Sequence, residues 1–131
     1  MIERYTNPEM GNIWSDQAKY QTWLDVEIAA CEANCKLGKI PQSAMETIRT
    51  KARFKPERIL EIEEEVRHDV IAFLTNVNEY VGDAGRYIHV GMTSSDVLDT
   101  GLALQLKSSV KLLRKELLLL EEAIRDLASQ H

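Results

Sequence analysis

The chain is poor in aromatic and turn-forming residues. Aromatic side chains make up only 6% of its 131 residues, and six glycines and three prolines are spread along it. Such sparse helix breakers favour a helical protein. No apolar run approaches the roughly 20 residues of a membrane-spanning helix, and the charged first residues contain no apolar core of a secretory signal. The sequence therefore predicts a cytoplasmic protein of one domain or slightly less than two.

An excess of basic residues is also missing. The sequence has 16 lysines and arginines against 21 aspartates and glutamates, which gives a formal net charge of −5 at pH 7. Proteins that bind nucleic acid or anionic membranes through general electrostatics need positive charge over the contact surface. The composition argues against a nucleic-acid or membrane partner, although it leaves room for a local basic pocket.

Cysteine is limited to Cys31 and Cys35. On a helix these residues could in principle share a metal ion, but no histidine or third cysteine is close in the sequence. They also continue an apolar series at steps of three or four residues, the spacing of one helix face: Tyr20, Leu24, Ile28, Cys31 and Cys35. We therefore expect free cysteines in the hydrophobic core rather than a metal site or a disulfide.

The pattern of apolar residues is helical throughout. A proline and a glycine interrupt the first dozen residues, which we expect to form an extended arm. Helices are then predicted over about 15–38, 41–52, 56–67 and 69–82. Ser15 or Asp16 can cap the first helix, Asp69 can cap the fourth, and a glycine ends both. No strand-like alternation occurs between them, so the predicted fold is all-α.

One long helix is predicted for the C-terminal part, over 97–131. At 1.5 Å per residue it would span roughly 50 Å. Apolar residues form a stripe along it at steps of three or four: Leu102, Leu106, Val110, Leu113, Leu117, Leu120, Ile124 and Leu127. The run "LLLL" at 117–120 adds leucine on every side, which is typical of a helix surrounded by neighbours. Because no glycine or proline ends this helix, we expect the natural chain to continue as a larger helical protein.

The stretch "IHVGMTSSDVLDT", residues 88–100, places several small polar residues directly before the long helix. Thr93 and Ser94 supply hydroxyls where the helix dipole is positive, which suits a carboxylate or a phosphate. Gly91 would allow the backbone to approach a ligand. The alternative is a plain capped turn, in which Ser95 or Asp96 alone starts the helix. On physical grounds the two interpretations are equally well supported.

Other candidate site residues also lie at predicted helix junctions. Arg67, His68 and Asp69 combine a cation, an imidazole and a carboxylate, and the carboxylate could fix the imidazole tautomer for binding or proton transfer. Taken alone, such a triplet is usually solvent-exposed, with Asp69 as a simple helix cap. Three further residues are no more specific individually: His89, Arg4 and Tyr5. Together they place titratable and anion-binding groups at the junctions, whereas the helix bodies look structural.

These motifs resemble a known family. The stretches "MIERYTNPEMGNIWSD", "RILEIEEEVRHDVIAF" and "HVGMTSSDVLDT" are similar to the N-terminal region of the bacterial adenylosuccinate lyases, within the fumarase/aspartase superfamily. The resemblance covers essentially all 131 residues in order. It implies an enzyme that eliminates fumarate from adenylosuccinate, giving AMP, and from succinyl-AICAR, giving AICAR, in purine nucleotide biosynthesis. It also implies that no metal and no organic cofactor takes part.

The resemblance implies roles for individual residues. Eight residues match positions that bind substrate in this family: Arg4, Tyr5, Arg67, His68, Asp69, His89, Thr93 and Ser94. The N-terminal pair would contact the nucleotide at its phosphate. His68 would orient the substrate or the acid group, and Thr93 and Ser94 would hold a carboxylate of the succinyl group.

Part of the family's active site has no match here. The acid histidine and the base serine belong to stretches that follow the matched region, and each active site draws on three subunits of a homotetramer. The resemblance thus implies a helical N-terminal domain over 1–95, the first long helix of a central bundle over 96–131, and no turnover by the chain alone. Two alternatives stay open, another lyase of the superfamily and a non-enzymatic helical interaction module.

Overall fold

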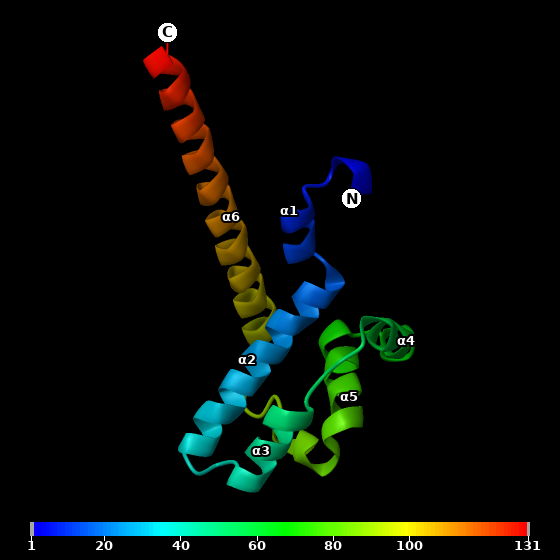
Figure 1. The fold of residues 1–131 in the computed structure, drawn as a ribbon. Coiled ribbons are helices and arrows are strands. Elements are labelled where there is room, and N and C mark those ends of the chain that lie inside the picture. The colour runs from blue at the N-terminus through cyan, green and yellow to red at the C-terminus, as the bar shows by residue number, and fades with distance from the viewer. Residues whose placement is uncertain (1, 131) are drawn as a thin grey trace.

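The computed structural model describes residues 2–130, and every regular element within them is a helix (Figure 1). The all-α prediction is therefore confirmed. None of these helices is long and apolar enough to cross a membrane. In chain order, with η for a 3-10 helix, the elements are η1 (Glu3–Tyr5), α1 (Pro8–Ile13), α2 (Asp16–Lys36), α3 (Gln42–Lys51), α4 (Pro56–Val66), α5 (Asp69–Val81), η2 (Gly82–Tyr87) and α6 (Ser94–Gln130).

The first dozen residues form short helices, so the prediction of an extended arm is wrong. Asn7 takes the N-cap position of α1, where its side chain accepts the backbone N–H of Met10 at 3.1 Å, and Pro8 occupies the first helical position. Both are ordinary signals for the start of a helix. The side-chain amide of Gln105 in α6 donates to the carbonyl of Ile13 at 2.8 Å. This bond holds the end of α1 against α6.

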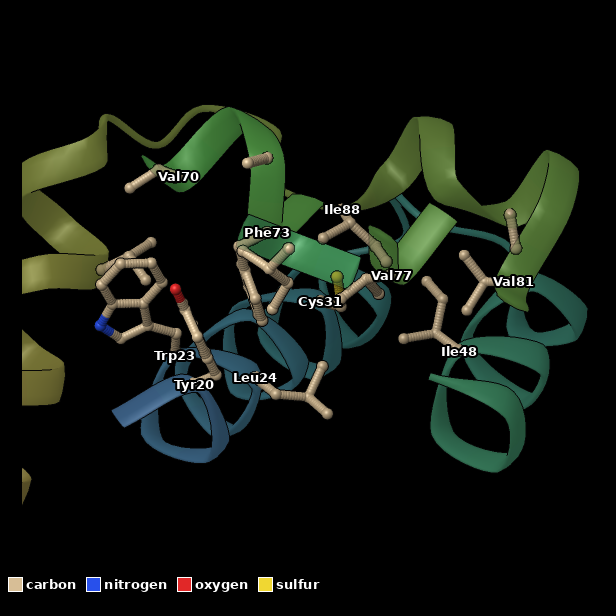
Figure 2. Packing of buried hydrophobic residues seen from close by; sticks show 14 of the residues in the cluster. Tyr20, Trp23, Leu24, Cys31, Ile48, Val70, Phe73, Val77, Val81 and Ile88 are labelled. Atoms are coloured by element: carbon tan, nitrogen blue, oxygen red, sulfur yellow. The ribbon is translucent and has the colours of Figure 1, made fainter. Parts of the chain in front are cut away.

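The hydrophobic core lies between α2, α3, α4 and α5 (Figure 2). Phe73 of α5 is fully buried; it stacks on Tyr20 with ring centroids 6.0 Å apart and packs edge-to-face against Trp23 at 5.6 Å. Cys31 is buried on the same face of α2, and burial raises the pKa of its thiol to about 11. Cys35 is half-buried, and both cysteines are free. The predicted core role is confirmed for Cys31, whose protonated thiol is a packing group.

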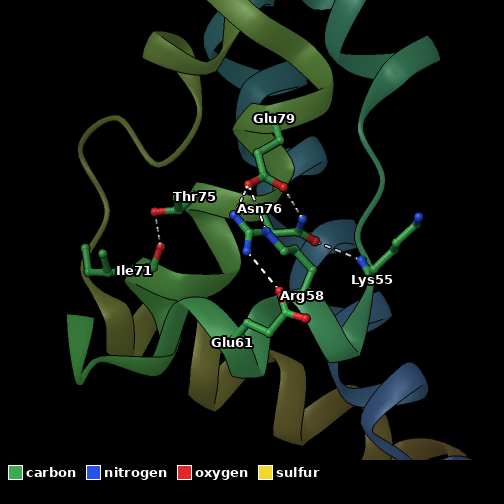
Figure 3. A network of polar contacts seen from close by, with 7 residues as sticks. All are labelled: Lys55, Arg58, Glu61, Ile71, Thr75, Asn76 and Glu79. Carbon is green, nitrogen blue, oxygen red and sulfur yellow. Dashed lines mark hydrogen bonds and ion pairs between the residues drawn. The ribbon is translucent and has the colours of Figure 1, made fainter. Parts of the chain in front are cut away.

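Polar contacts join α4 to α5 next to this core (Figure 3). The Arg58 guanidinium of α4 pairs with the Glu79 carboxylate of α5 at 2.9 Å. The buried Asn76 amide donates to the other Glu79 oxygen at 2.9 Å and accepts the backbone N–H of Lys55 at 2.8 Å. The exposed ion pair adds little, whereas removing the buried amide would leave the Lys55 N–H without a partner. Asn76 therefore anchors the start of α4 on α5.

Only the first half of α6 contains buried residues, and they lie on one side of the helix. Four residues at steps of four are buried on the side that contacts α1 and α2: Val97, Gly101, Gln105 and Ser109. The leucine stripe lies outside this contact; Leu113, Leu117 and Leu127 are 53%, 64% and 58% exposed. With its 37 residues α6 is about 55 Å long. Its second half projects beyond the other helices (Figure 1).

Gly101 permits the close crossing of α6 over α2. A Cβ atom at this position would lie 2.8 Å from Cδ1 of Trp23. We predict that Gly101→Val lowers the free energy of unfolding by about 1–3 kcal/mol, the usual cost of overpacking, because Trp23 is itself held by Phe73. Thr100→Val, on an exposed position of the same helix, should change it by about 0.5 kcal/mol or less. Chemical denaturation of the chain measures both, and equal stabilities would contradict the crossing.

Candidate functional site

The junction between α4 and α5 contains three of the predicted site residues. Arg67 ends α4 in the left-handed region, with φ 53°, and His68 follows in extended conformation as the N-cap of α5. Nδ1 of His68 accepts the backbone N–H of Ile71 at 3.3 Å. Asp69 is the first residue of α5. The prediction that Asp69 caps this helix is therefore wrong, because the left-handed Arg67 puts His68 at the capping position.

The cap fixes the state of the His68 ring. Since Nδ1 accepts a backbone N–H, the neutral ring carries its proton on Nε2. Oδ1 of Asp69 lies 3.6 Å from the same Nδ1 atom, which is too far for a hydrogen bond, and instead accepts the N–H of Val70 at 2.7 Å. The backbone, and not Asp69 as the sequence suggested, selects the tautomer. His68 therefore presents an Nε2–H donor on a side chain that is nearly half exposed.

The turn before α6 is built around His89. Its backbone is left-handed, with φ 66°, and only Arg67 shares this feature among the non-glycine residues in 2–130. Glu27 of α2 holds the turn: Oε2 accepts the His89 backbone N–H at 3.0 Å, and Oε1 lies 2.5 Å from ring atom Nδ1. Left-handed backbone costs of order 1–3 kcal/mol and persists where surrounding contacts impose it. Here the Glu27 carboxylate imposes it.

Glu27 was not recognised from the sequence. Its side chain is only 1% exposed, and burial raises the pKa of the carboxyl group, while the hydrogen bonds from His89 act in the opposite direction. The sequence does contain a signal for the burial of Glu27. This residue follows Tyr20 and Leu24 and precedes Cys31 at helical spacing, so it falls on the buried face of the helix. A glutamate at such a position requires a partner. The sequence does not say which residue that partner is.

The structure starts α6 three residues earlier than predicted. The helix begins at Ser94, and Oδ2 of Asp96 accepts the backbone N–H of Thr93 at 2.8 Å. Asp96 therefore occupies the third position of the helix and forms the acidic half of a capping box, so neither Ser95 nor Asp96 is the cap itself. The hydroxyls of Thr93 and Ser94 donate no hydrogen bond to any residue in 2–130. They remain available to a ligand.

The structure does not bring all the predicted site residues together. Arg4 and Tyr5 lie in η1, where the guanidinium stacks 4.8 Å from the ring centroid of the exposed Tyr5. Across the described part of the chain, no hydrogen bond or ion pair joins this N-terminal segment to the α4–α5 junction or to the start of α6. Nor do three His, Cys, Asp or Glu side chains in 2–130 gather where they could hold a metal ion.

Comparison with known proteins identifies the family. The lyase family profile matches residues 3–131. The chain belongs to this lyase family. It is 70% identical over 131 residues to the adenylosuccinate lyase of Synechocystis sp. and 46% identical to that of Bacillus subtilis. These matches cover 100% of this lyase chain but 30% of each relative, so the chain spans less than a third of their length.

Solved structures share the fold of this chain. The 3-carboxy-cis,cis-muconate lactonizing enzyme of Pseudomonas putida matches 86% of this chain and 27% of its own, with a TM-score of 0.78 and 31% identity. A fumarate lyase of Mesorhizobium sp. matches 83% of this chain and 26% of its own, with a TM-score of 0.73 and 27% identity. The helical arrangement is thus shared with a lactonizing enzyme and with a fumarate lyase.

His68 should reveal its capping role through stability. We predict that His68→Ala lowers the free energy of unfolding by about 1 kcal/mol, because the Ile71 N–H loses its acceptor. His68→Asn should restore most of the loss, since asparagine is a good N-cap. Thermal and chemical unfolding of the two variants provide the measurement. If His68→Asn were no more stable than His68→Ala, Nδ1 would not be the cap.

Proposed function

We propose that this chain is the N-terminal part of an adenylosuccinate lyase, which eliminates fumarate from adenylosuccinate and from succinyl-AICAR in purine nucleotide biosynthesis in the cytoplasm. The observation that carries the proposal is 70% identity to the Synechocystis enzyme over the whole chain. In this proposal residues 1–95 form the N-terminal domain and 96–131 begin a central helical bundle. The part of the enzyme that this chain does not span supplies the main acid and base.

The start of α6 suits the chemistry of such an elimination. Removing a proton beside a carboxylate moves negative charge onto that carboxylate, and fixed donors lower the barrier. The Thr93 and Ser94 hydroxyls are donors of this kind, and the positive end of the α6 dipole adds to them. Their lack of partners within residues 2–130 supports a role as a cradle for a carboxylate of the succinyl group.

The other predicted residues fit supporting roles in the same proposal. His68 presents Nε2–H beside Arg67 and Asp69, which suits the orientation of a substrate or of the acid group. Arg4 and Tyr5 provide an exposed cation and phenol for the nucleotide phosphate. Since no hydrogen bond or ion pair joins these groups within residues 2–130, we propose that a complete site assembles from several subunits of a homotetramer. The exposed leucines of α6 support this, because an apolar surface of that length normally has a partner.

Variants of the full-length enzyme separate catalysis from capping at α6. We predict that Thr93→Ala and Ser94→Ala each slow fumarate release on the order of 100-fold, the typical loss when one donor to a developing charge is removed, with little change in melting temperature. Asp96→Asn is the matched control: it weakens the bond to the Thr93 N–H and should lower stability first. Rates and melting curves of the three variants make the comparison.

Three results would count against parts of this proposal. If the hydroxyl variants only melt earlier and keep full turnover, the hydroxyls are caps. If the wild-type enzyme leaves adenylosuccinate intact but acts on another dicarboxylate adduct, the chain belongs to a different lyase of the superfamily. If it acts on none, a helical interaction module is the better description.

A further inference from the structure

The Glu27 carboxylate has a single partner among the described residues. Both of its oxygens face His89, one toward the backbone N–H at 3.0 Å and one toward ring atom Nδ1 at 2.5 Å. No buried side-chain nitrogen or oxygen within residues 2–130 lacks a hydrogen bond. A buried carboxylate could be satisfied by any hydrogen-bond donor. Both oxygens of Glu27 instead bond to His89, in the turn before α6.

The geometry restricts where the ring proton of His89 resides. The backbone N–H is always a donor, so Oε2 is an acceptor. When Glu27 is ionised, Oε1 also accepts, which requires the proton of the neutral ring to lie on Nδ1. The remaining atom, Nε2, makes no hydrogen bond within residues 2–130, and the His89 side chain is 20% exposed. Nε2 is therefore the ring atom that a ligand can reach.

We propose that Glu27 is a positioning residue that locks His89 in the Nδ1–H tautomer and leaves Nε2 as an acceptor for a hydroxyl or N–H group of the substrate. The claim that Nε2 accepts a hydrogen bond from the substrate rests on the proposed lyase function. The claim that Glu27 fixes the His89 tautomer does not. His68 shows the opposite arrangement, because a backbone N–H occupies its Nδ1 and leaves Nε2–H as a donor. The two histidines would thus offer one donor and one acceptor at the same ring position.

Replacing Glu27 by glutamine should reverse the tautomer. The amide has one accepting oxygen and one donating nitrogen, while the His89 backbone N–H still requires an acceptor. The amide oxygen therefore turns to the backbone, and the amide nitrogen donates to Nδ1. The ring proton moves to Nε2, and the acceptor is lost with almost no change in side-chain shape.

Nitrogen-15 NMR of the histidine rings tests the proposal in the 131-residue chain. At about pH 9, above the ordinary histidine pKa, the wild-type His89 should show a protonated Nδ1 and a lone pair on Nε2, and Glu27→Gln should show the reverse. Glu32→Gln is the matched control on α2, because Glu32 pairs with Arg49 instead. A wild-type Nε2–H tautomer, or an equal mixture, would overturn the proposal even if the Glu27 variant did not fold.

Turnover of the full-length enzyme tests the link to the substrate. Glu27→Gln should lower kcat on the order of 100-fold, the lower end of what a positioned proton donor or acceptor contributes, and Glu32→Gln should leave it unchanged. Equal rates for the two variants would reject the positioning role. If the wild-type enzyme did not cleave adenylosuccinate, the proposed function would fail, but the NMR result would still decide the tautomer.

Discussion

The contact between Glu27 and His89 ties α2 to the turn that precedes α6. It spans 62 positions of sequence and supplies two hydrogen bonds from one residue to one carboxylate. Burying an unpaired carboxylate would cost several kcal/mol, and leaving the His89 donors without an acceptor would add to that cost. The direction of α6 and the location of Thr93 and Ser94 both follow from the turn that this contact holds.

The candidate site residues also define the helix ends. Arg67 terminates α4, His68 caps α5, and the Thr93 backbone N–H donates the capping-box bond to Asp96. A helix start leaves backbone N–H groups without partners inside the helix, so polar side chains gather there for structural reasons. The same groups then face solvent with unused donors or acceptors. This double use explains why stability and turnover must be measured together at each position.

The fold was largely predictable, because the apolar spacing and the turn residues locate the helix bodies. The differences are local. Asn7 and Pro8 start a helix where an extended arm was expected. The N-caps of α5 and α6 are not the residues predicted, because several neighbouring polar residues can each cap the same helix start. The contact of Glu27 with His89 was not predictable, since its partner lies 62 positions away. The burial of Glu27 was open to inference from helical spacing, although its partner was not.

The most direct test is a crystal structure of the full-length enzyme with adenylosuccinate bound, in a variant that lacks the base. We expect a succinyl carboxylate oxygen within about 3.2 Å of the Thr93 or Ser94 hydroxyl, which is hydrogen-bonding distance. We also expect Nε2 of His89 to face a donor group of the substrate. A substrate bound elsewhere, with these hydroxyls contacting only water, would contradict the assignment of this helix start to the active site.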